Sequence, residues 1–254
     1  MARFGGPFFR RGVVRLKVAQ AFVGTAGWSI PPAYKSRFPS EGSLLERYAT
    51  RLEAVEVNSS FSRSHRRSTY EKWARSVGPD FRFSVKLPKA ITHDHGLADA
   101  SNLFRNFADE VTGLGDKLGV VLVQLPPKLA FDAGIARRFF GHARSVIPAA
   151  FAIEPRHASW FTPEADAFLK RLSVTRVAAH PVLHGDGEPG GWDGFAYYRL
   201  HGAPRTYYSD YGEASLDHIA EKMAQSPAVS SWCIFDNTAE GAALGNALSI
   251  AERL

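Results

Sequence analysis

Eight short apolar runs alternate with longer segments of helical periodicity from residue 20 onward. The runs lie at residues 21–24, 54–58, 81–86, 120–124, 151–154, 175–179, 195–200 and 232–235. Most are continuously apolar, which is typical of parallel strands covered by helices outside and by barrel core inside. Eight alternations within 254 residues predict an α/β fold with a single (β/α)8 TIM-like barrel, and they disfavour an open doubly wound sheet.

Helical segments fill most of the intervals between the runs. They lie at residues 43–51, 68–77, 101–118, 132–146, 163–172, 213–225 and 240–253. Ser43 with Glu46 forms a capping box, and Thr162 before Pro163 suits an N-cap followed by proline at the first helical position. The sixth connection, residues 180–194, is too rich in Gly and Pro for a helix. We therefore expect a long loop in place of the sixth helix.

The net charge of +6 is concentrated near the N-terminus. Residues 1–19 hold five Arg and Lys residues and no acid, which leaves 26 basic and 25 acidic residues in the remainder. We expect a basic, flexible N-terminal arm at residues 1–19 and a nearly neutral barrel domain at residues 20–254. Such an arm can add affinity for polyanions, whereas a solvated tail is the simpler interpretation.

The apolar stretches and the cysteine content indicate the cellular location of the protein. The longest apolar stretches are well short of the ~20 residues that a membrane helix needs. The single cysteine, Cys233, lies in an apolar run, which predicts a buried structural thiol. No secretory signal is visible. We therefore expect a cytoplasmic protein without membrane contact.

Polar residues gather where the predicted strands end. They are Glu56 and Asn58, Ser84 and Lys86, Gln124, Glu154, Tyr197 with Arg199 and His201, and Asp236 with Asn237. Side chains alternate between the two faces of a strand, so Glu56 and Asn58 share the inner face. Barrel enzymes carry the active site at the C-terminal ends of their strands, so this pattern predicts a site at the barrel mouth. The alternative is an internal salt-bridge network of Glu56, Lys86, Glu154 and Arg199 that only fills the mouth.

A set of motifs spans nearly the whole predicted barrel. They read GTAGWS (24–29), EVNSSF (56–61), FSVK (83–86), KLG (117–119), QLPP (124–127), EPRHASW (154–160), YRLHG (198–202) and FDNT (235–238). In this order, from about residue 22 to 250, they resemble the DUF72 family, also called YecE-like. The resemblance implies a barrel of the DUF72 type but names no reaction. It marks as motif positions Gly24, Trp28, Glu56, Asn58, Lys86, Gln124, Glu154, Arg156, His157, Trp160, Arg199 and His201.

Three positions depart from the family pattern. Ala26 replaces a usual Ser, Ser62 replaces a usual Tyr, and Asp236 stands where Asn is common. The first two remove hydroxyl groups near the expected mouth, and the third adds a carboxylate. We therefore expect the ligand preference of this chain to differ within the family.

Cationic side chains at the strand ends favour an anionic, phosphate-containing ligand, either a small molecule or a nucleic acid. Lys86, Arg156, Arg199 and His201 would form the anion clamp. The candidate catalytic residues are Glu56, Glu154 and His157, because carboxylates and imidazole can transfer protons. The other candidate binding residues are Trp28, Asn58, Gln124, Trp160, Asp236 and Asn237. The corresponding activity is hydrolysis of a phosphodiester or a nucleic acid.

Two other functions and a metal cofactor stay open. His93 with His95, or His180 with His184, could help bind a divalent metal, although no specific ligand motif exists. The first alternative is a carboxylate-pair enzyme for a sugar or another polar small molecule, with Trp28, Trp160 and Tyr197 stacking on the ring. The second is a non-enzymatic nucleic-acid or metabolite binding protein that uses the basic arm.

Overall fold

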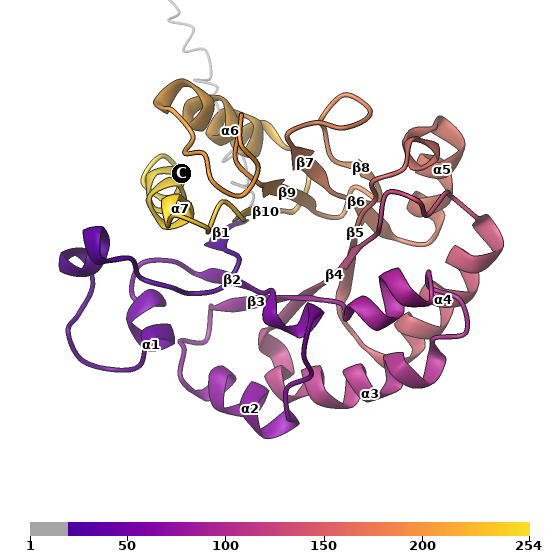
Figure 1. Cartoon of the computed structure of the whole chain (residues 1–254), viewed down its shortest axis with the longest axis horizontal. Helices are drawn as coiled ribbons and strands as arrows, with labels where there is room; N and C mark the ends of the chain where they lie inside the picture. Colours follow the sequence, from indigo (N-terminus) through magenta and orange to yellow (C-terminus); the bar gives the residue numbers. More distant parts are fainter. Residues whose placement is uncertain (1–19) are drawn as a thin grey trace, which may run out of the picture.

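The apolar runs form a ring of parallel strands in the computed structural model, which describes residues 20–254 (Figure 1). The strands are β1 (Gln20–Thr25), β2 (Ala54–Val57), β3 (Arg82–Lys86), β4 (Leu118–Gln124), β5 (Ala150–Glu154), β6 (Val174–Arg176), β7 (Ala178–His180), β8 (Gly190–Gly191), β9 (Ala196–Leu200) and β10 (Ser230–Phe235). Parallel pairing runs β2-β3-β4-β5-β6 in one sheet and β1-β10-β9-β7 in the other. The predicted basic arm, residues 1–19, lies outside the described residues.

Two seams join these sheets into an eight-stranded barrel, although the hydrogen-bond ladder is interrupted at both. At the first seam Val177 separates β6, which pairs with β5, from β7, which pairs with β9. The sixth strand, expected as one run at 175–179, is therefore split between the sheets. At the second seam Ala26 forms a parallel bridge with Glu56, and the N–H of Gly27 donates to the Glu56 carbonyl at 2.8 Å. The predicted TIM-like barrel is confirmed.

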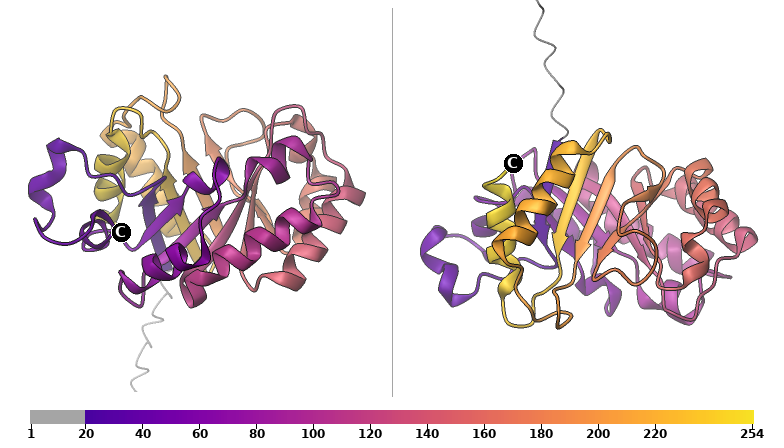
Figure 2. Two further views of the ribbon diagram at one scale, coloured as in Figure 1. Left: turned by 60° about the horizontal axis from the view of Figure 1, so that its bottom comes forward. Right: turned by 90° about the horizontal axis from the view of Figure 1, so that it is seen from above.

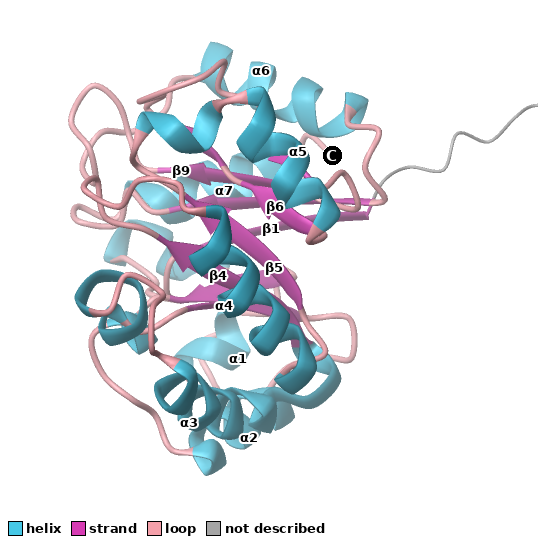
Figure 3. Cartoon of the chain, turned by 90° about the vertical axis from the view of Figure 1, so that its right-hand side faces the viewer, coloured by secondary structure: helices cyan, strands magenta, loops and turns pink. Residues whose placement is uncertain are grey.

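Helices cover the outside of this ring (Figure 2, Figure 3). They are α1 (Leu44–Tyr48), α2 (Arg67–Arg75), α3 (Ser101–Val111), α4 (Ala133–Val146), α5 (Pro163–Arg171), α6 (Glu213–Gln225) and α7 (Ala242–Ala251). Shorter helical turns are η1 (Pro32–Arg37), η2 (Ser59–Phe61), η3 (Ala90–Asp94), η4 (Thr112–Lys117) and η5 (Ala158–Phe161). Both predicted caps are confirmed: Ser43 and Glu46 form the reciprocal box, and Thr162 accepts from the N–H of Ala165.

One predicted helix is too long, and one predicted loop is confirmed. The helix expected at 101–118 ends at Val111, because Gly115 has a φ of 56° and Leu118 already begins β4. In the sixth connection, residues 181–195 contain no helix, and β8 pairs antiparallel with β6. Without a sixth helix, a groove of about 580 Å³ remains beside α6, lined by Trp192, Phe195 and Tyr198 among others.

The apolar core has two layers, one inside the barrel and one between the strands and the helices. Tyr197 belongs to the inner layer, whereas Tyr198 and Leu200 belong to the outer layer, as the predicted alternation requires. Trp232 fills the inner layer, with its ring stacked on Tyr197 at a centroid distance of 6.0 Å. A Cβ on Gly119 would lie 2.6 Å from the Trp232 ring, so glycine makes room for the indole.

Two further expectations concern Cys233 and membrane spans. Cys233 is buried on β10, and burial raises the pKa of its thiol, which fits a structural thiol. Across residues 20–254, no helix has both the length and the apolar character that crossing a bilayer requires.

Candidate functional site

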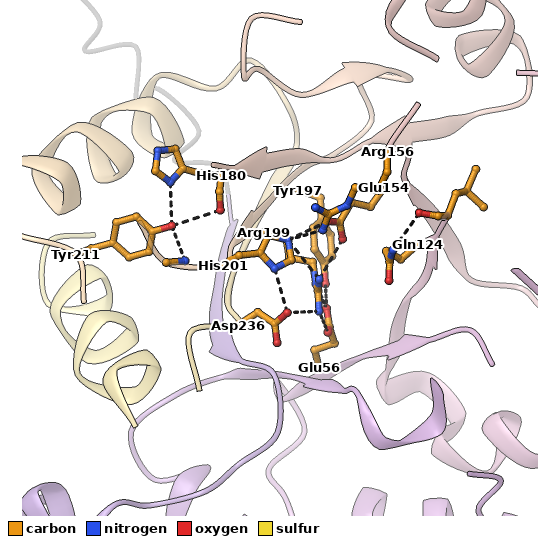
Figure 4. A network of polar contacts seen from close by, with 12 residues as sticks. Glu56, Gln124, Glu154, Arg156, His180, Tyr197, Arg199, His201, Tyr211 and Asp236 are labelled. Atoms are coloured by element: carbon orange, nitrogen blue, oxygen red, sulfur yellow. Dashed lines mark hydrogen bonds and ion pairs between the residues drawn. The ribbon is translucent and has the colours of Figure 1, made fainter. Parts of the chain in front are cut away.

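The polar strand ends meet at the barrel mouth as a buried cluster of charged side chains (Figure 4). Glu56 comes from β2, Glu154 from β5 and Arg199 from β9, while His201 and Asp236 follow β9 and β10. All five are at most 4% exposed. Because burying charges without partners is costly, the contacts among these groups decide what the site can bind.

Arg199 lies at the centre of this cluster. Its Nε and Nη2 donate to the two carboxylate oxygens of Glu56 at 3.0 and 2.8 Å, and its Nη1 donates to Glu154 at 3.1 Å. Its Nη2 also lies 2.9 Å from Asp236 Oδ2. Three carboxylates thus surround one guanidinium. Arg199 therefore supplies a fixed positive charge but offers little free donor capacity to a ligand.

His201 bridges two of the same carboxylates. Its Nε2 lies 2.9 Å from Glu154 Oε1, and its Nδ1 lies 3.1 Å from Asp236 Oδ2. An ionised carboxylate only accepts hydrogen bonds, so bonding to both carboxylates at once needs the imidazolium form, in which both ring nitrogens donate. Arg156 Nη2 also lies 3.0 Å from Nε2. Burial opposes this charge, but Glu154 and Asp236 outweigh it and raise the pKa of His201.

Glu154 is held as a carboxylate by three cationic groups. Burial alone would raise its pKa, but Arg199, His201 and Arg156 outweigh burial and hold the pKa of Glu154 far below its ordinary value. Arg156 donates from Nη2 to Glu154 Oε1, and its Nε is buried without a partner among the described residues. Glu154 therefore carries no proton to donate near neutral pH.

Lys86 differs from the other cations of the mouth because no carboxylate pairs with it. It ends β3, is 7% exposed, and its Nζ lies 4.2 Å above the centroid of the Phe61 ring. Within residues 20–254, its ammonium makes neither a hydrogen bond nor an ion pair. Asn58, at the end of β2, likewise has a buried Oδ1 without a partner in the described part of the chain. Lys86 Nζ, Asn58 Oδ1 and Arg156 Nε are therefore the polar atoms of the site that are left to bind a ligand.

Tyr197 connects the charged cluster to the apolar interior of the barrel. Its hydroxyl donates to Glu56 Oε2 at 3.2 Å and lies 2.9 Å from the Ser84 hydroxyl, which can donate to it. Burial and the neighbouring Glu56 raise its pKa well above the ordinary value, so the hydroxyl keeps its proton. Tyr197 therefore forms the floor of the site.

Several predicted site residues do not join this cluster. His157 caps η5, where its Nδ1 lies 2.9 Å from Ser159 Oγ, and Trp160 is 2% exposed with its indole N–H bonded to Leu129. Trp28 packs edge-on against Trp73 of α2 at a centroid distance of 5.0 Å. These side chains serve local packing and capping, because their partners are neighbouring loop and helix residues.

Two further predicted residues also have local partners. Gln124 donates to the Leu125 carbonyl at 3.0 Å and lies apart from the charged cluster in Figure 4. Asn237 donates to the Ser209 carbonyl and to Asn246, both at 2.9 Å, and so fastens the end of β10 to neighbouring segments. The motifs at residues 124–127 and 235–238 thus each contain a position with a structural role.

The sequence did not indicate that the segment after β9 folds over the mouth. Tyr207 has a φ of 71°, and its ring meets the His201 ring edge-on at 5.7 Å. Tyr211 anchors the segment, because its hydroxyl accepts from the N–H of Gly202 and lies 2.9 Å from His180 Nδ1. No local sequence signal distinguishes Tyr207 from an ordinary loop residue. Residues 20–254 contain no group of three or more His, Cys, Asp or Glu side chains that could hold a metal ion.

A ring of parallel strands with charged residues at their C-terminal ends defines a protein of the TIM-barrel class. Residues 22–254 match the DUF72 family, whose description is "Protein of unknown function DUF72". The chain therefore belongs to this family. The resemblance seen in the motifs is thereby confirmed.

Known relatives agree with this assignment. The protein YecE of Escherichia coli K12 is 28% identical over 105 residues, which cover 41% of this chain and only 37% of YecE. A DUF72 family protein of Enterococcus faecalis has a similar structure, with a TM-score of 0.79 at 20% identity over 92% of this chain and 95% of that chain. A DUF72 family protein of Thermotoga maritima gives a TM-score of 0.76 at 25% identity over 92% of this chain and 98% of that chain.

Proposed function

We propose that the barrel mouth binds a small anionic ligand that carries a phosphate group. The observation that carries this proposal is the Lys86 ammonium, which is largely buried at the mouth without a carboxylate partner among residues 20–254. A buried cation without a counter-ion is costly, and an anion that enters the mouth removes this cost. The unpaired Nε of Arg156 supplies a second donor for the same anion.

The charge balance of the cluster supports the same ligand class. Four cationic groups, Lys86, Arg156, Arg199 and imidazolium His201, are accompanied by three carboxylates, Glu56, Glu154 and Asp236. An excess of one positive charge remains in a largely buried site. In this proposal Arg199 and His201 supply fixed charge, whereas Lys86 and Arg156 contact the anion.

The contacts of Glu56 and Glu154 bear on the proposed hydrolase activity. A general acid must hold a proton near neutral pH, and the lowered pKa of Glu154 works against that role. Glu56 already receives two hydrogen bonds from Arg199 and one from Tyr197. We therefore propose that both carboxylates orient the cations around the ligand, and that binding is the function on which any chemistry depends.

Calorimetric titration with inorganic phosphate tests this proposal. The substitution Lys86→Met keeps the side-chain length and removes the charge, and it should weaken phosphate binding about tenfold or more, the loss of one charge-assisted contact worth at least ~1.4 kcal/mol. The matched control is Lys35→Met, an exposed lysine of η1, which should bind as the unmodified chain does. Equal affinities for the unmodified chain and Lys86→Met would contradict the proposal.

A salt series separates a small anion from a nucleic acid as the ligand. Binding of a single-stranded oligonucleotide that tracks several phosphates falls steeply with salt, because each contact releases counter-ions. A single phosphate in the mouth gives a shallow salt dependence. Tight oligonucleotide binding with a steep salt slope would favour the nucleic-acid alternative.

A further inference from the structure

Lys86 lacks the hydrogen-bond acceptors that a structural lysine has. Lys117 shows the structural case, because its Nζ donates to the carbonyls of Ala74 and Val77. Lys86 has no such acceptors in the described part of the chain, although three carboxylates lie in the same mouth. Those carboxylates are bound to Arg199 and His201 instead. The amino group therefore stays free at the end of a barrel strand.

The surroundings of Lys86 also raise the fraction of the neutral amine, the reactive form, that is in equilibrium with the ammonium. Burial lowers the pKa of Lys86, and the nearby guanidinium of Arg199 lowers it further, against the opposing effect of Glu56, Glu154 and Asp236. A lysine desolvated beside another cation is the usual arrangement for an amine that attacks carbonyl groups. The Phe61 ring under Nζ keeps one side of the amine apolar.

We propose that Lys86 Nζ forms an imine with the carbonyl group of a small anionic aldehyde, ketone or 2-oxo acid. This inference rests on the proposed function, because the anionic group of the substrate would occupy the anion site beside Arg156. It adds a covalent reaction that anion binding by itself does not require.

The reaction balances without an added oxidant, reductant or cofactor. The lone pair of Lys86 Nζ attacks the carbonyl carbon, and the π electrons of the C=O bond move to oxygen. Two protons pass from nitrogen to that oxygen, which leaves as water, and a C=N bond forms. The net change is one amine plus one carbonyl compound giving one imine plus one water.

Reductive trapping of the full chain tests the proposal. The protein is incubated with pyruvate or dihydroxyacetone phosphate, reduced with sodium borohydride, and analysed by intact mass and peptide mapping. We expect one adduct per chain, located on Lys86. Since the fraction of neutral amine rises as a lysine pKa falls, Lys86 should be trapped faster than the exposed Lys35. Adducts spread evenly over surface lysines, or no adduct at saturating probe, would overturn the proposal.

The controls separate this inference from anion binding. Lys86→Met should lose the adduct and Lys35→Met should keep it, while the peptide map of the unmodified chain locates the adduct without any variant. Inorganic phosphate, which has no carbonyl group, should slow trapping by occupying the anion site. Phosphate binding without trapping at Lys86 overturns only the imine. Trapping at Lys86 that phosphate never slows supports the imine and contradicts the shared anion site.

Discussion

Arg199 and Glu56 face each other across the barrel interior, with Nε and Nη2 of the guanidinium donating to both oxygens of the carboxylate at 3.0 and 2.8 Å. The two residues lie 143 positions apart and come from β9 and β2, which are not neighbours in the ring. Both are at most 1% exposed. The ion pair therefore braces the mouth between strands that no backbone hydrogen bond connects.

Removing Arg199 should destabilise the fold strongly. Arg199→Met leaves Glu56 and Glu154 buried without their main counter-ion, and this should lower the free energy of unfolding by about 3–5 kcal/mol. Urea unfolding followed by circular dichroism measures the change. The control Lys170→Met breaks an exposed ion pair with Asp193 and should leave the unfolding midpoint unchanged. Similar midpoints for both variants would mean that the buried network contributes nothing to stability.

Glu154 should make stability depend on acid pH. Its folded pKa lies below the ordinary 4.5, so the stability it contributes is present above about pH 4.5 and is lost as pH falls toward the folded pKa. Glu154→Gln cannot titrate. It should be about 3 kcal/mol less stable at neutral pH and should lose less additional stability on acidification. Melting temperatures across an acid pH series measure this, with the exposed Glu53→Gln as control. Parallel curves for Glu154→Gln and the unmodified chain would count against the role of Glu154.

Asp236 should set the protonation of His201. The pKa of His201 is raised above 6.5, so its contribution to stability is complete below about pH 6.5 and is lost as pH rises through the folded pKa. In Asp236→Asn the ring should titrate at lower pH, because one carboxylate partner is lost, and the alkaline loss of stability should begin earlier. An NMR titration of the imidazole measures the shift. The exposed Asp80→Asn is the control, and an unchanged His201 titration in Asp236→Asn would refute the assigned imidazolium.

Gly119 should be essential for packing the barrel interior. In Gly119→Ala the new Cβ would lie 2.6 Å from Trp232, and such overpacking typically costs about 1–3 kcal/mol. In Gly141→Ala the added methyl meets no atom within 4 Å on α4, so helix propensity should raise stability by about 0.5–1 kcal/mol. Thermal unfolding of both variants gives the comparison. A gain in both would show that Trp232 can move aside at little cost.

The local patterns of the sequence predict most of the fold. The alternation of apolar runs predicts the eight barrel strands. The Gly and Pro content of residues 180–194 predicts that a loop replaces the sixth helix. Both depend on neighbours along the chain, so they can be read without knowledge of the rest of the molecule. The split of the sixth strand at Val177 could not be predicted, because it depends on which strand lies on either side.

For the candidate site, the period of two along β2, β3 and β9 was enough to place Glu56, Ser84, Tyr197 and Arg199 on the inner face. Residue type alone did not distinguish Trp160, which is buried in packing, from a ligand-binding aromatic. It also gave Arg199 and Lys86 the same role as anion donors. Their contacts separate them: carboxylates surround Arg199, while Lys86 has none.

The sequence by itself determined which side chains reach the barrel mouth, because strand periodicity fixes the face and the strand end fixes the height. Only the tertiary structure decided how their charges pair. Glu56, Glu154 and Asp236 come from separate strands, and each could have paired with Lys86 or with Arg199. In the folded barrel all three carboxylates lie within ion-pair distance of Arg199, and none pairs with the amino group of Lys86. Coulomb energies and hydrogen bonds depend on separation in space and not on separation along the chain.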